Sequence, residues 1–169
     1  MLAHKFYNKE YKDHVLNESI LDIVSKTELL SLSTIGPDLK PHINTSFFSY
    51  DNHLNLYFIS SPNTKHVLNL VSNSNVAATI FDSKLRFWED DMQGLQIFGT
   101  CQKTQLLQLP KAMAAFIRRF PVFASLVSSP DDFTKKAVEV RMYTIKTTKI
   151  KLFDEKRFGE EVFIDLELC

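Results

Sequence analysis

One seven-residue segment concentrates the side chains that could bind an anion, Ser60-Ser61-Pro62-Asn63-Thr64-Lys65-His66. It offers three hydroxyl groups, a lysine and a histidine where a predicted strand ends and a short predicted helix begins. Hydroxyl donors, the free amides and partial positive charge of a helix start, and a cation together suit a monophosphate. The alternative is a capped helix, with Ser61, Asn63 or Thr64 as the cap and the lysine solvated. The residues alone leave both interpretations open.

Motifs for other common chemistries are absent from the sequence. The four glycines form no Gly-x-Gly-x-x-Gly, phosphate-loop or Gly-x-Ser-x-Gly pattern. The five histidines never take metal-ligand spacing with one another or with Cys101 and Cys169, so we predict no metal site and two reduced thiols. Residue types do not exclude a Ser-His-Asp hydrolase, but no pattern points to one. We assign no catalytic residue, because no side chain is an evident acid or base.

The composition is that of a globular protein with an aromatic-rich interior. The 169 residues include 44% hydrophobic side chains and 14 phenylalanines, and a chain of this length buries a substantial core. The 20 basic and 20 acidic residues balance, so we expect no binding to nucleic acid or to a membrane. The N-terminus lacks a signal-peptide pattern, and the uncharged segment Leu29–Ile35 is too short to cross a bilayer. We therefore expect a cytoplasmic protein.

Local patterns predict a β-rich order of elements. Apolar residues at helical spacing predict helices over 1–26, 67–73, 110–120 and 122–127. Alternating or β-branched segments predict strands over 27–35, 41–50, 54–59, 76–81, 94–104, 137–149 and 162–166. This order does not alternate strand and helix as a doubly wound sheet does. The short connections favour a closed or half-closed antiparallel barrel with helices at its ends.

The chain has no internal repeat and no low-complexity linker, so we expect a single domain over residues 1–169. Its parts are an N-terminal helix (1–26), a barrel core (27–104), a helical insertion (109–128) and closing strands (137–166). In the insertion, Arg118 and Arg119 are expected to complement the dipole of their helix. Three phenylalanines there are expected to pack onto the barrel: Phe116, Phe120 and Phe123.

The loop between the strands predicted over 76–81 and 94–104 carries Trp88 and three acidic residues. It is interpreted as an exposed acidic loop with one packed indole, and a substrate lid is the alternative.

Four motifs, in this order, resemble the FMN-binding split barrels related to pyridoxamine 5'-phosphate oxidase. They are Pro41-His42, Tyr57-Phe58-Ile59-Ser60, Thr64-Lys65-His66-Val67-Leu68-Asn69-Leu70 and Asn75-Val76-Ala77-Ala78. The second half resembles a narrower bacterial group through residues 118–122, 138–141 and 158–161. The resemblance, over roughly residues 27–164, implies a mainly β fold with α-helices. It implies an antiparallel, Greek-key-like split barrel of six to seven strands with flanking helices.

The resemblance also implies a flavin site. The strand Asn44-Thr45-Ser46-Phe47 would run beside the isoalloxazine, with its backbone amides and carbonyls meeting the polar edge of the ring. The FMN phosphate would be held by Ser60, Ser61, Thr64, Lys65 and His66. In this family the flavin lies at a twofold interface, which implies a homodimer. Gln96 would then reach the ring from the partner subunit, although a half-exposed strand glutamine is the alternative for this residue.

The leading functional hypothesis is an FMN-dependent oxidoreductase of unknown substrate, in which the flavin supplies the redox chemistry. The true oxidase carries an arginine-rich C-terminal segment that grips the substrate phosphate. This chain ends instead in Ile164-Asp165-Leu166-Glu167-Leu168-Cys169, so production of pyridoxal phosphate is not expected. Two alternatives stay open. One is a flavin-binding or flavin-sensing protein without enzymatic activity, and the other is a haem-binding split barrel with His42 or His66 on the iron.

Overall fold

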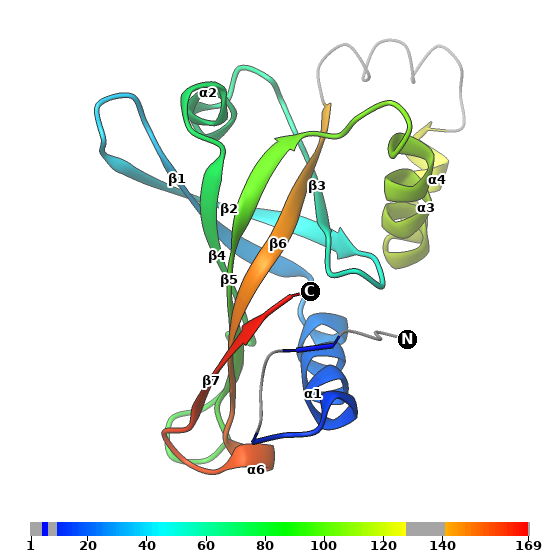
Figure 1. Ribbon diagram of the computed structural model, residues 1–169. Coiled ribbons are helices and arrows are strands. Elements are labelled where there is room, and N and C mark those ends of the chain that lie inside the picture. Colours follow the sequence, from blue (N-terminus) through cyan, green and yellow to red (C-terminus); the bar gives the residue numbers. More distant parts are fainter. Residues whose placement is uncertain (1–4, 7–9, 128–140, 169) are drawn as a thin grey trace.

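Seven antiparallel strands form one sheet, and six of them close into a barrel (Figure 1). The computed structural model describes residues 5–6, 10–127 and 141–168. The strands are β1 (Leu29–Ile35), β2 (Pro41–Tyr50), β3 (Leu56–Ser60), β4 (Asn75–Phe81), β5 (Gln93–Lys103), β6 (Arg141–Asp154) and β7 (Phe163–Glu167). They are hydrogen-bonded in the order β3-β2-β1-β4-β5-β6-β7, and β3 also pairs with β6. Six strands therefore close the barrel and β7 extends it beyond β6, which confirms the predicted fold class.

Five helices flank the barrel in the described part of the chain. They are α1 (Asp13–Lys26), α2 (Lys65–Ser72), α3 (Leu109–Arg119), α4 (Pro121–Val127) and α6 (Glu155–Phe158). In Figure 1, α1 and α2 lie toward opposite ends of the barrel, and α3 packs against β2 and β3. None of these described helices has the length and apolar character needed to cross a membrane.

Alternating side chains build the core inside the barrel. Leu30 and Leu32 of β1 and Ile80 of β4 point inward and are at most 1% exposed. Leu16 and Ile20 lie on one face of α1 and are fully buried with them. Each such side chain contributes about 1.5–3 kcal/mol when it leaves water. The period of two in the strands and the helical spacing in α1 are the patterns on which the prediction rested.

The N-terminal helix is shorter than the predicted 1–26. It begins at Asp13, whereas Phe6 forms a β-bridge with Leu168 at the other end of the chain. The apolar residues at helical spacing start only at Val15, so the segment before Asp13 has no helical face to bury.

The closing strand β6 is longer than predicted at its C-terminal end. It continues past residue 149 to Asp154, because Ile150 and Leu152 keep the inward alternation and are fully buried. The first residues predicted for this strand, 137–140, lie outside the described residues. The short helix α6 that follows β6 was not predicted.

The helical insertion packs onto the barrel as predicted. Phe116, Phe120 and Phe123 form a cluster with Tyr57 of β3 and Met142 of β6. This cluster is separate from the core inside the barrel. The insertion therefore covers the outer side of β3 and the beginning of β6.

Arg119 connects this insertion to α1. It lies in the last turn of α3, as expected, but its guanidinium donates to the carbonyl oxygens of Val24 and Thr27 at the C-terminal end of α1. It also lies over the rings of Phe48 and Tyr50. A cation is favourable at a helix C-terminus, so Arg119 stabilises the end of a helix that is remote in the sequence.

The prediction of a packed indole in the acidic loop is wrong. Trp88 is 89% exposed, and the neighbouring Phe87 is exposed as well. The loop is braced by polar contacts instead, because Arg86 forms ion pairs with Glu89 and Asp90.

A buried carboxylate joins the β2–β3 turn to α3. Asp51 is buried and accepts a hydrogen bond from the Tyr57 hydroxyl at 2.8 Å. It also forms an ion pair with Lys111 at 2.7 Å. The backbone amides of His53 and Asn55 donate to its other oxygen. Burial by itself raises the pKa of a carboxyl, but these donors, Lys111 first, outweigh it and lower the pKa of Asp51 to about 2.

The stability that Asp51 contributes should be lost in acid. Its folded pKa lies below the ordinary value of 3.8, so ionised Asp51 stabilises the fold above about pH 4, and this contribution disappears as the pH falls through 2. The shift corresponds to about 2 kcal/mol. Urea unfolding of the wild type and of Asp51→Asn between about pH 6 and pH 2 measures it. The difference in the free energy of unfolding between the two proteins should shrink as the pH falls, and a constant difference would contradict the assignment.

Candidate functional site

The predicted anion-binding segment lies where β3 ends and α2 begins, and its side chains converge on one histidine. Ser60, the last residue of β3, places its Oγ 2.8 Å from Nε2 of His66. Thr64 places its Oγ1 3.2 Å from the same nitrogen and 3.1 Å from the Ser60 hydroxyl. Two hydroxyl groups and an imidazole therefore form one compact polar cluster at the start of the helix.

The first turn of α2 is not capped by a side chain. Thr64 occupies the N-cap position, but its hydroxyl makes no cap hydrogen bond and donates to the Ser61 carbonyl oxygen at 2.9 Å. The Ser61 hydroxyl accepts from the Asn63 amide, which lies before the helix. The capped-helix interpretation predicted instead that a side chain would accept a hydrogen bond from an amide of the first turn. The free amides of the first turn remain open to an external acceptor, as an anion site requires.

Lys65 is the cation of this cluster. It is the first residue of α2 and is exposed, and its ammonium has no ion-pair partner among the residues that the structure describes. A lysine in this position is free to meet a ligand phosphate beside the helix start.

The surroundings of His66 favour its neutral form. Its ring is 8% exposed and lies parallel to that of His42, with 6.4 Å between the ring centroids. Burial, and secondly the neighbouring His42, lower the pKa of His66 from its ordinary 6.5. A neutral imidazole has one acceptor nitrogen, so Nε2 accepts from the hydroxyls or donates to them according to its tautomer.

The second predicted element of the site is Asn44-Thr45-Ser46-Phe47. It lies in the part of β2 that does not pair with β3. β2 pairs with β1 over residues 41–47 and with β3 only over residues 48–50. The Asn44 side-chain amide donates to the Ser46 hydroxyl, and its buried Oδ1 has no hydrogen-bond partner among the described residues. Thr45 and Phe47 point to the outer, exposed face. This edge of β2 therefore offers backbone groups and one buried acceptor to a ligand.

Gln96 does not join the rest of the site within one chain. Ser60 pairs with Arg141 at the start of β6, whereas Gln96 pairs with Lys151 near its other end. About 30 Å of strand separates these two positions. The structure thus brings together the cluster at the start of α2 and leaves Gln96 at the opposite end of the barrel.

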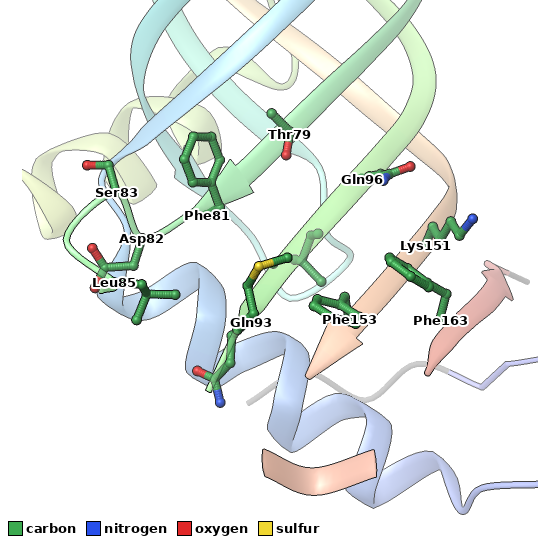
Figure 2. A pocket seen from close by; sticks show the side chains of 13 residues that line it. Thr79, Phe81, Asp82, Ser83, Leu85, Gln93, Gln96, Lys151, Phe153 and Phe163 are labelled. Carbon is green, nitrogen blue, oxygen red and sulfur yellow. The ribbon is translucent and has the colours of Figure 1, made fainter. Parts of the chain in front are cut away.

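Two hollows on the surface were not predicted. One, about 440 Å³ in volume, lies over β5 around Gln96, with Phe81 and Leu85 on one side and Phe153 and Phe163 on the other (Figure 2). Its walls come from four strands, so only cross-strand register assembles them. The other, about 610 Å³, surrounds the Asp51–Lys111 ion pair.

Comparisons with known proteins agree with this fold. The family model described as pyridoxamine 5'-phosphate oxidase matches residues 16–149. No curated protein matches the sequence. Several solved structures are similar at low sequence identity, which supports the fold alone.

A haem-binding protein from Mycobacterium smegmatis aligns with a TM-score of 0.71 at 11% identity, over 93% of this chain and 59% of that one. This chain therefore spans less than two thirds of the mycobacterial protein. HutZ, a haem storage protein from Vibrio cholerae, aligns with a TM-score of 0.66 at 14% identity, over 86% and 99%. A Clostridium acetobutylicum protein related to general stress protein 26, of the pyridoxinephosphate oxidase family, aligns with a TM-score of 0.61 at 16% identity, over 93% and 96%. With its closed barrel and the family match over residues 16–149, the chain belongs to the pyridoxamine 5'-phosphate oxidase family.

Proposed function

We propose that this protein binds FMN and serves as a flavin-dependent oxidoreductase for a small molecule. The observation that carries the proposal is the uncapped start of α2, where Thr64 turns its hydroxyl toward His66 and away from the helix amides. Ser60, Ser61 and the exposed Lys65 complete a set of donors suited to a terminal phosphate. An FMN phosphate is the group in this family that such a set would hold.

The edge of β2 supports a place for the flavin ring. Asn44 carries a buried oxygen without a partner among the described residues, and the ring of a flavin has an N–H donor that would satisfy it. The backbone of Thr45, Ser46 and Phe47 lies along the edge that β3 leaves open. When bound there, the flavin would supply hydride or electron transfer, and the protein would fix its position.

We also propose a homodimer with the flavin at its interface. Apolar side chains lie on the outer face of β1, β2 and β5, where a monomer would leave them in water: Leu29, Ile35, Ile43, Phe47 and Phe98. Exposed apolar surface on one face of a sheet supports an association site. A twofold partner would also bring its Gln96 toward the flavin, which one chain cannot do by itself.

Light scattering should return a dimer at micromolar concentration, and Ile43→Glu should dissociate it. Ile43 is 68% exposed, so the charge costs little in a monomer but is buried without a partner in the proposed interface. We expect the dimer dissociation constant to rise about a hundredfold. Val71→Glu, on an exposed position of α2, is the matched control. A wild type that is monomeric under these conditions would rule out both the dimer and the interfacial flavin.

Haem binding is the second candidate function. Two similar structures are a haem-binding and a haem storage protein, and His42 and His66 lie close together. Nε2 of His66 already contacts two hydroxyls, so the half-buried His42 is the better placed iron ligand.

Titration with FMN, riboflavin and haemin separates these functions. We expect a yellow complex with FMN and at least about tenfold weaker binding of riboflavin, because most of the named donors address the phosphate. Reduction of the bound flavin by a nicotinamide donor would distinguish an enzyme from a flavin carrier. Equal affinity for riboflavin and FMN would refute the phosphate site. A Soret band that is lost in His42→Ala would establish haem instead.

A further inference from the structure

The hollow over β5 has aromatic side chains on its walls and a glycine, Gly94, at its floor. One row of cross-strand neighbours runs from Phe81 through Gly94 and Phe153 to Phe163. Gly94 interrupts this row of aromatic side chains. The nearest atoms to a Cβ at Gly94 would be the carbonyl oxygen of Ile80 at 3.2 Å and the Cβ and Cα of Phe81 at 3.5 and 4.0 Å. Gly94 itself lines the hollow.

The gap has the dimensions of one aromatic ring. Side chains two strands apart, such as Phe81 and Phe153, start about 9.5 Å from each other. A ring midway between them would lie about 4.8 Å from each, within the range of favourable aromatic pairs. Phe153 and Phe163 stack with centroids 4.4 Å apart and extend this wall. A volume of about 440 Å³ is that of a small-molecule pocket.

The next row along the sheet is polar and supplies a cation. It runs from Thr79 through Gln96 to Lys151 and Asp165. Lys149 forms the ion pair with Asp165 at 2.8 Å. The ammonium of Lys151 lies 4.8 Å from the ring centroid of Phe163.

Two polar side chains line the hollow, and their polar atoms are open to a ligand. The side chains of Gln96 and Lys151 have no hydrogen bond or ion pair within the described ranges. Asp82 also lines the hollow, but on the loop at the far side from Lys151, and its Oδ1 accepts the Lys84 amide (Figure 2). The positive charge thus lies at one edge of the gap, beside the amide of Gln96.

We propose that this hollow binds a planar aromatic acid. The ring lies over Gly94 between Phe81 and Phe153, and the acidic group meets Lys151 and Gln96. The site is distinct within one chain from the cluster at the start of α2, because it lies at the other end of β6. It does not require that cluster to bind FMN. The ligand chemistry is that of a free aromatic carboxylate.

Binding of 2-naphthoate, followed by its fluorescence or by calorimetry, tests the site. We expect Lys151→Met to raise the dissociation constant about five- to tenfold, because it removes one charge-assisted contact at a half-exposed position. Neutral 2-naphthalenemethanol should bind the wild type and Lys151→Met equally. Decahydronaphthalene-2-carboxylate, which is not planar, should bind more weakly than 2-naphthoate. Lys146→Met, an exposed lysine on the same strand, should change nothing.

Gly94→Val tests the floor, because its branched side chain would occupy the gap and should abolish binding of both aromatic probes. Thermal unfolding would show whether Gly94→Val is folded. If Gly94→Val does not fold, Lys151→Met still tests the site. Absence of 2-naphthoate binding to the wild type, or equal affinity in Lys151→Met and the wild type, would overturn the proposal.

Repeating the titration with saturating FMN shows whether the hollow is separate from the flavin. Unchanged 2-naphthoate affinity would assign the hollow to a separate ligand. Displacement of 2-naphthoate, with weaker FMN binding in Lys151→Met, would overturn the proposal, because the hollow would then belong to the flavin site. In the first case Lys65→Ala should leave 2-naphthoate binding unaltered, so that failure of the FMN site and failure of this site give different results.

Discussion

Lys65→Ala is expected to weaken FMN binding ten- to a hundredfold. The ammonium is exposed beside the uncapped first turn of α2 and has no ion-pair partner among the described residues, so a phosphate would be its principal contact. A charge-assisted contact is worth about 1.5–3 kcal/mol, and about 1.4 kcal/mol corresponds to one decade of affinity. Riboflavin binding should be unchanged, because riboflavin lacks the phosphate. Fluorescence quenching of the flavin measures both affinities.

The same variant should leave the unliganded fold nearly unaltered, because an exposed lysine in a first helical turn contributes little to stability. It even removes a small repulsion from the helix dipole. Saturating FMN should raise the melting temperature of the wild type more than that of Lys65→Ala, since bound ligand stabilises the native state. Lys84→Ala, an exposed lysine in the loop between β4 and β5, is the control for charge. If Lys65→Ala binds FMN as tightly as the wild type does, the phosphate lies elsewhere on the barrel.

Gly99→Ala should be the most destabilising small substitution in the barrel. The register between β5 and β6 shifts at Phe98 and Gly99, where Thr148 is the extra residue of β6. A Cβ at Gly99 would overlap the carbonyl oxygen of Lys146 and would lie 3.1 Å from the Thr147 Cα. Backbone atoms cannot rotate away as a side chain can, so the two strands would have to separate. We expect a loss of about 3–4 kcal/mol in the free energy of unfolding, at the upper end of the range for overpacking.

Gly94→Ala is the matched control, because it places the same methyl group on the same strand. Its nearest neighbour would be the Ile80 carbonyl oxygen at 3.2 Å, which requires only a small adjustment. We expect a loss below about 1 kcal/mol, or none. Urea unfolding of the two variants and the wild type measures the difference. Similar stabilities for Gly99→Ala and Gly94→Ala would mean that the β5–β6 bulge relaxes without cost.

Membership of the family does not imply that this protein acts on the substrate of pyridoxamine 5'-phosphate oxidase. The C-terminal strand β7 here pairs along β6 and directs Phe163, Asp165 and Glu167 outward. Two of these three side chains are acidic and would repel a substrate phosphate. If the protein is an oxidoreductase, its substrate therefore has to be found by experiment. The hollow beside β7 supplies a first set of candidates, the aromatic acids.

The local patterns of the sequence were enough to predict most strands and helices of this protein. The alternation in β1 and β4 and the apolar spacing of α1 after Val15 directly encode which side chains are buried. In β2 the apolar Ile43 and Phe47 lie on the exposed face instead. The segment 60–66 was identified as a candidate site because its donors are adjacent in the chain. Where the local pattern was absent, as before Asp13, the prediction was wrong.

The tertiary structure decided the features that depend on residues far apart in the chain. Whether a side chain caps the start of α2 depended on the orientation of the Thr64 hydroxyl, which contacts His66 and makes no cap hydrogen bond. The closure of the barrel by the pairing of β3 with β6, and the gap over Gly94, depend on cross-strand register. A strand sequence specifies which of its faces is buried, but not which strand will lie beside it. That choice is set by packing of the whole barrel, and it alone brings these residues together.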